Sequence, residues 1–116
     1  MTTPNNSVAI FSLQHKQRIY NGKVGDISLE GAKLFVDIPG KLEKGAILCH
    51  ITLTLYYRLS SIVQTVLTIP EAEIIWSNFE KEVTNTVGIK YILSENNLNA
   101  LSNYIEFRSI EESSKK

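Results

Sequence analysis

The sequence predicts an all-β domain, a small antiparallel barrel that is followed by one α-helix. Short runs of β-forming residues recur between turn signals along residues 7–93, enough for six or seven strands. The clearest run alternates apolar and polar residues with a period of two over residues 47–57. From Ser94 onward the apolar residues change to helical spacing.

Length and composition indicate one soluble domain. The chain has 116 residues, 43% of them apolar, which is enough for a single core. Its 12 basic and 12 acidic residues give a net charge of zero, which argues against broad binding to nucleic acid or to a membrane surface. Cys49 is the only cysteine, so no internal disulfide can form, and no apolar run approaches the roughly 18 residues of a membrane span. With no signal-peptide segment at the start, we expect a cytoplasmic protein.

The first strands surround one ambiguous turn. A strand is predicted over Ser7–Leu13. Asn21-Gly22 is the strongest two-residue hairpin signal, but Gln14-His15-Lys16 is a competing break that would let the second strand run from Arg18 to Ser28. A third strand is expected over residues 32–37, ended by Pro39-Gly40, and residues 41–45 form a solvated connection.

The second half of the chain continues the pattern. After the strand at 47–57, Ser60-Ser61 is a break, and a strand over 62–69 is expected to end or kink at Pro70, since proline cannot donate to a ladder. Strands at 72–79 and 84–93 follow, separated by a charged turn over residues 78–82.

The final segment reads as an amphipathic helix. Ser94 is a predicted N-cap, and Leu98, Leu101 and Ile105 form an apolar stripe that Tyr104 and Phe107 widen. We expect residues 1–6 to be a flexible N-terminal arm, residues 7–110 the domain, and residues 111–116 a flexible C-terminal tail.

Catalysis finds little support in this sequence. Cys49 and His50 are adjacent on a strand and therefore point to opposite faces, with Cys49 on the apolar face as an expected core residue. Two histidines and one cysteine give no metal-ligand spacing, and no phosphate-binding or dinucleotide fingerprint occurs. We expect neither an enzyme nor a resident cofactor or metal.

Polar residues gather around one predicted strand end. Asp26 and Ser28 stand two apart and share a face of an extended backbone, and Gly31 follows at the turn. These groups can receive the polar edge of a small ligand. Alternatively, Asp26 and Ser28 hydrogen-bond the turn itself and Gly31 supplies a positive φ. Trp76 likewise has two interpretations, a core residue or a platform for a base.

Residues 26–32, Asp-Ile-Ser-Leu-Glu-Gly-Ala, match the Asp/Asn-x-Ser-x-x-Gly signature, and the chain thereby resembles the PilZ domain family. Gly45 before a long strand, the strand ending in Trp76, Gly88-Ile89-Lys90-Tyr91 and the closing helix follow in the family's order over most of residues 8–108. The resemblance implies a six-stranded antiparallel PilZ-like β-barrel with one C-terminal helix. It also implies a bacterial regulatory module of cyclic di-GMP signalling, of the kind that acts in motility, which binds this second messenger through Asp26, Ser28 and Gly31 and relays it to a protein partner.

The sequence departs from the family pattern at its start. The family's Arg-x-x-x-Arg segment would fall within residues 1–7, which contain no basic residue. Losing two charge-assisted arginine contacts would weaken binding by about 3–6 kcal/mol.

Three explanations stay open for the missing arginines. They can lie outside this chain, or basic residues such as Arg18, Lys23 or Lys33 can substitute for them, or the domain is a degenerate adaptor of the pilus or motility type that binds proteins and no nucleotide. If the second strand is unbroken, Arg18 starts about 26 Å from Asp26. If the chain instead turns at Asn21-Gly22, Arg18 can reach the site.

Overall fold

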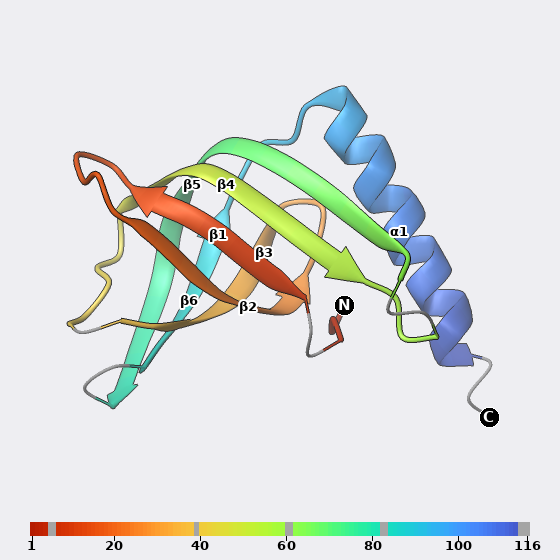
Figure 1. The fold of residues 1–116 in the computed structure, drawn as a ribbon, viewed down its shortest axis with the longest axis horizontal. Coiled ribbons are helices and arrows are strands. Elements are labelled where there is room, and N and C mark those ends of the chain that lie inside the picture. The colour runs from red at the N-terminus through yellow and green to blue at the C-terminus, as the bar shows by residue number, and fades with distance from the viewer. Residues whose placement is uncertain (5–6, 39, 60–61, 82–83, 114–116) are drawn as a thin grey trace.

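The chain forms a closed barrel with a helix at one end in a computed structural model, which describes residues 1–4, 7–38, 40–59, 62–81 and 84–113 (Figure 1). The strands pair antiparallel around the barrel in the order β1-β2-β3-β6-β5-β4. The elements are β1 (Val8–Leu13), β2 (Ile19–Ile27), β3 (Gly31–Asp37), β4 (Ile47–Tyr56), β5 (Gln64–Lys81), β6 (Thr84–Lys90) and α1 (Glu95–Ser113). The predicted six-stranded antiparallel barrel with one C-terminal helix is therefore confirmed.

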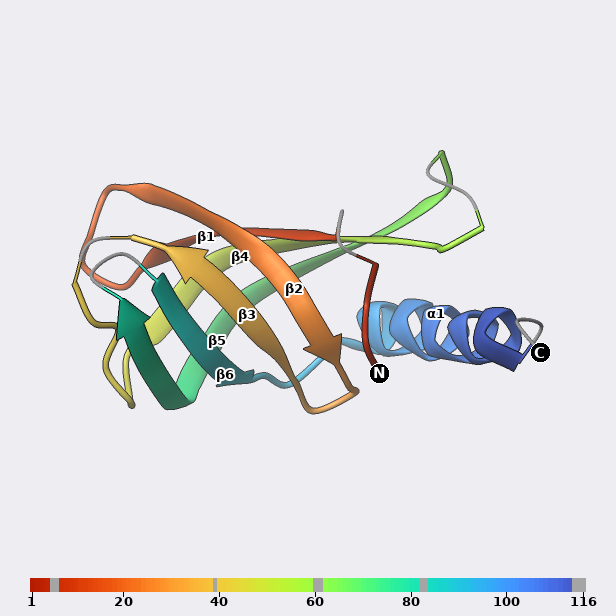
Figure 2. The ribbon, with the colours of Figure 1, turned by 90° about the horizontal axis from the view of Figure 1, so that it is seen from below.

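The first hairpin turns at the earlier of the two candidate breaks. Ser12 pairs with Ile19, and Asn21-Gly22 lies inside β2, where it pairs with Ile10 and Ala9 of β1. The β1–β2 turn and the β2–β3 turn therefore lie at opposite ends of β2, as Figure 2 shows. This separation fixes which basic residues can approach the predicted site.

The alternation of β4 is interrupted at His50. This residue has a positive φ of 51°, and the pairing of β1 with β4 shifts register beside it. As a result Leu48, before the interruption, and Ile51, after it, are both buried, while Cys49 is only partly buried. The expectation that Cys49 belongs to the core is wrong, because the bulge reverses the faces.

β5 is one continuous strand, not two strands separated at Pro70. β6 pairs with β5 only from Glu73 onward, and the β4 register leaves Pro70 unpaired beside His50. The missing N–H of Pro70 therefore costs no ladder bond. The charged turn predicted over 78–82 is wrong for residues 78–81, because β5 extends to Lys81. The predicted breaks at Ser60-Ser61 and Pro39 lie outside the described residues.

The core fills the barrel and continues under α1. Leu101 and Tyr104 are the buried apolar residues of the helix, and the Tyr104 hydroxyl donates to the Tyr56 carbonyl oxygen at 2.6 Å. Leu98 is exposed, and the buried face continues instead through Arg108 and Glu111. Figure 2 shows α1 beyond the end of the barrel, beside the extended end of the β4–β5 hairpin. In the described part of the chain, no helix combines the length and apolar character needed to cross a membrane.

The described residues near both ends make specific contacts. α1 extends to Ser113, with Glu111 buried. Thr3 is also buried, and its amide donates to the Gly25 carbonyl oxygen at 3.0 Å, so the first residues lie along β2.

Candidate ligand site at the β2–β3 hairpin

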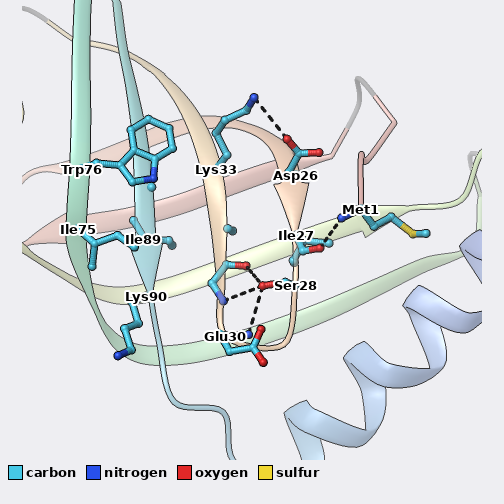
Figure 3. Close-up of a pocket in the computed structure, with 13 residues that line it drawn as sticks. Met1, Asp26, Ile27, Ser28, Glu30, Lys33, Ile75, Trp76, Ile89 and Lys90 are labelled. Carbon is cyan, nitrogen blue, oxygen red and sulfur yellow. Dashed lines mark hydrogen bonds and ion pairs between the residues drawn. The ribbon is translucent and has the colours of Figure 1, made fainter.

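Ser28 holds the turn between β2 and β3. Its amide donates to the Gly31 carbonyl oxygen at 2.8 Å, and its Oγ accepts the amides of Glu30 at 3.3 Å and Gly31 at 3.2 Å (Figure 3). Ser28 thus performs the turn role that is the alternative to ligand binding, while its side chain stays exposed at the rim.

Gly31 serves close packing and not a positive φ. Among the described glycines only Gly40 and Gly45 have positive φ, so the conformational role expected for Gly31 is wrong. A Cβ atom added at Gly31 would overlap the carbonyl oxygen of Ile89 on β6. The glycine is required because the two backbones approach too closely for any side chain.

Tyr91 secures the hairpin from the end of β6. Its hydroxyl lies 2.8 Å from the Ser28 carbonyl oxygen and 2.9 Å from that of Gly31, and its amide donates to Glu30. Burial raises the pKa of the Tyr91 phenol, and the Glu30 carboxylate raises it further, so the hydroxyl remains a donor. The sequence analysis did not assign this role to Tyr91, although the residue belongs to the segment Gly88-Ile89-Lys90-Tyr91 on which the resemblance partly rests.

Asp26 is held by two neighbours. Thr2 Oγ1 donates to Oδ1 at 3.0 Å, and Lys33 Nζ lies 3.3 Å from Oδ2. Burial alone would raise the pKa of Asp26, but the Thr2 hydrogen bond and the Lys33 ammonium outweigh it and lower the pKa below its usual value. The carboxylate is therefore ionised at neutral pH and available as an acceptor.

An open pocket of about 400 Å³ joins this hairpin to the neighbouring strands. Asp26, Ser28 and Gly31 line one side, and Trp76 lines the other (Figure 3). Trp76 is 42% exposed, and its indole lies across Gly88 so closely that a Cβ there would overlap Nε1. The core interpretation of Trp76 is therefore wrong, and the pocket has an aromatic wall.

The basic residues named from the sequence divide by position. Lys33 lines the pocket, and so does Lys90, which sequence reasoning missed. Lys23 lines a smaller adjoining pocket of about 250 Å³ together with Asp26 and Lys33. Arg18 lies at the other end of β2, with its guanidinium 5.5 Å from the centre of the Tyr20 ring, so it is not brought to the site.

The arrangement offers recognition and not an evident reaction. Two carboxylates (Asp26 and Glu30), backbone carbonyls, an indole face and two lysine ammonium groups can accept donors, stack a flat ring and neutralise anionic oxygens. Within the described ranges, no group of three or more His, Cys, Asp or Glu side chains could hold a metal ion.

Comparison with known proteins supports the architecture. No family model matches the chain, and no curated protein matches it. The chain is similar in structure to MrkH of K. pneumonia in its apo state, with a TM-score of 0.77 and 15% sequence identity. The similarity covers all of this chain and 52% of MrkH, so the chain spans about half the length of that protein. At this identity the likeness concerns the fold alone, and the fold of this chain is the PilZ-like barrel with a C-terminal helix.

Proposed function

We propose that this chain is a regulatory PilZ-type module that binds cyclic di-GMP at the β2–β3 hairpin and relays its presence to a protein partner. The observation that carries the proposal is the pocket in which the signature residue Asp26 lies opposite the exposed indole of Trp76. A guanine base has a flat face for the indole and N–H donors on its edge for a carboxylate.

Two lysines support the phosphate end of the same ligand, although the carboxylates of Asp26 and Glu30 in the same pocket balance their charge. Lys33 and Lys90 line the pocket and can approach phosphate oxygens. Lysine is a point charge without the bidentate fork of arginine, and Lys33 is already engaged by Asp26 at 3.3 Å. We therefore propose that this chain binds weakly by itself, and that arginines from outside the chain strengthen the complex.

Trp76 provides a direct test, because it is the only tryptophan in the chain. Titration with cyclic di-GMP should quench its fluorescence, and calorimetry should give the same dissociation constant. Asp26→Ala should weaken binding by about tenfold to a hundredfold, the loss of one charge-assisted hydrogen bond. Arg18→Ala, at the other end of β2, is the matched control and should leave the affinity unchanged.

A second candidate function is an adaptor that binds proteins and no nucleotide. It is favoured by the intramolecular partners that already occupy the Ser28 hydroxyl and the Asp26 carboxylate. The described part of the pocket wall carries lysines in place of arginines. Unchanged fluorescence and no heat up to millimolar cyclic di-GMP, from a folded protein, would contradict the first proposal and favour this one.

A further inference from the structure

The first residues of the chain lie between the barrel and the helix. Thr2 forms an antiparallel bridge with Asp26, and the Ile27 amide donates to the Met1 carbonyl oxygen at 2.8 Å. Thr3 is buried, and its hydroxyl donates to the carbonyl oxygen of Val24. Figure 2 shows this segment between the end of β2 and α1, so it can transmit contacts from one to the other.

Arg108 of α1 reaches this segment from the other side. Its Nη2 donates to the Thr2 carbonyl oxygen at 2.9 Å, and its side chain is 4% exposed. Its Nη1 lies 3.2 Å from Glu111 Oε1 and 3.1 Å from Glu112 Oε1. Ion pairs with two carboxylates thus hold Nη1, while Nη2 donates to the backbone of the first residues.

Glu111 anchors that guanidinium to the barrel. Its two carboxylate oxygens accept the backbone amides of Arg58 at 3.0 Å and Leu59 at 2.8 Å, just after β4. Backbone amides therefore fix Glu111, and Glu111 in turn holds the guanidinium of Arg108.

Thr2 connects this cluster to the ligand site. Its carbonyl oxygen accepts from Arg108, and its hydroxyl donates to Asp26 Oδ1 at 3.0 Å. We infer that Arg108 is a positioning residue for the site, which orients the Asp26 carboxylate through Thr2. The consequence for ligand affinity rests on the proposed function, whereas the consequence for Asp26 itself does not.

A double-mutant cycle on Asp26 tests the inference. The pKa of the Asp26 carboxyl is measured by NMR titration in the unmodified chain, in Thr2→Val, in Arg108→Lys and in the double variant. Thr2→Val removes the donor to the carboxylate, and Arg108→Lys keeps a positive charge beside Glu111 but loses the planar fork. Each single change should raise the pKa of Asp26, and the double variant should raise it no further than the larger single effect.

Two results would overturn the inference: an unchanged pKa of Asp26 in Arg108→Lys while Thr2→Val raises it, or additive shifts in the double variant. Ser109→Ala is the matched control, because the Ser109 hydroxyl donates to Ile105 within the helix, and it should leave the pKa unchanged. If Arg108→Lys does not fold, Arg108→Gln with Glu111→Gln removes both buried charges together and is read in the same way.

Ligand titration separates this inference from the proposed function. If cyclic di-GMP binds, Arg108→Lys should lower the affinity for it, as Thr2→Val should. If the unmodified chain does not bind it, the proposed function fails, while the pKa cycle still decides whether Arg108 positions Asp26.

Discussion

Gly31 is a position where the hairpin tolerates no side chain, since a Cβ would overlap the Ile89 carbonyl oxygen. Both groups belong to paired backbone, as Ala32 pairs with Ile89, so neither can move without breaking the ladder. We predict that Gly31→Ala lowers the free energy of unfolding by about 1–3 kcal/mol, the usual cost of overpacking. Chemical denaturation measures it.

The control for this substitution is Gln64→Ala on the exposed start of β5, which should change the free energy of unfolding by less than about 0.5 kcal/mol. Equal stability of Gly31→Ala and the unmodified chain would show that β3 and β6 can separate slightly, and that the close approach is not what requires glycine.

Trp76 shows how far a residue type predicts its own environment. Ala72 and Ile74 are buried, so simple alternation places Trp76 in the core with them. The pairing of β5 with β6 shifts register between Ile74 and Trp76, and this bulge turns the indole outward onto Gly88. Nothing local in the sequence marks the bulge, whereas the signature Asp26-x-Ser28-x-x-Gly31 was located by its residues alone.

At the scale of the element, the β2–β3 hairpin depends on one hydroxyl from the end of β6. Tyr91→Phe removes the donor that lies within 2.9 Å of both the Ser28 and Gly31 carbonyl oxygens. We predict a loss of about 1 kcal/mol in the free energy of unfolding. Hydrogen exchange should rise most at the Gly31 and Ser28 amides, while the β4–β5 ladder keeps its protection relative to global unfolding.

Phe107→Leu on α1 is a control for that experiment, because the Phe107 ring packs edge-on against Tyr57, which follows β4, with the ring centres 5.0 Å apart. Uniformly faster exchange throughout the barrel in Tyr91→Phe, with no excess at the turn, would contradict a local role for this hydroxyl.

Strand patterns predicted the elements better than their ends. The run at 47–57 and the N-cap at Ser94 correspond to β4 and the start of α1, with the Ser94 carbonyl accepting from the Leu98 amide at 2.8 Å. The break expected at Pro70 failed because its effect depends on whether a neighbouring strand needs its N–H. That is a property of the sheet and not of the residue.

On the scale of the whole molecule, the sequence predicted the barrel and the helix but not how they are joined. A 116-residue chain with regular strand signals leaves little choice of architecture, and the resemblance supplied the order. The joint between them, meaning the contact of α1 with the end of the barrel, contains the buried ion pair of Arg108 and Glu111, whose side chains are 4% and 1% exposed. Charged residues near a chain end are normally solvated, so only the folded arrangement identifies them as buried.

This joint predicts how stability depends on pH. Burial alone would raise the pKa of Glu111, but the amides of Leu59 and Arg58 and the Arg108 guanidinium lower it below the usual value of 4.5. A lowered pKa in the folded state means that the contribution of Glu111 to stability is complete above pH about 4.5 and is lost as the pH falls through the folded-state value.

Glu111→Gln should lower the free energy of unfolding by about 3 kcal/mol at pH 7, because it breaks a buried ion pair. The difference from the unmodified chain should shrink as the pH falls toward 3, since acid protonates Glu111 in the unmodified chain. Urea titrations between pH 7 and pH 3 measure both values, with Glu106→Gln on the exposed side of α1 as the control that should be nearly neutral at pH 7. A difference that stays constant across this range would mean that the carboxylate charge of Glu111 does not hold the helix to the barrel.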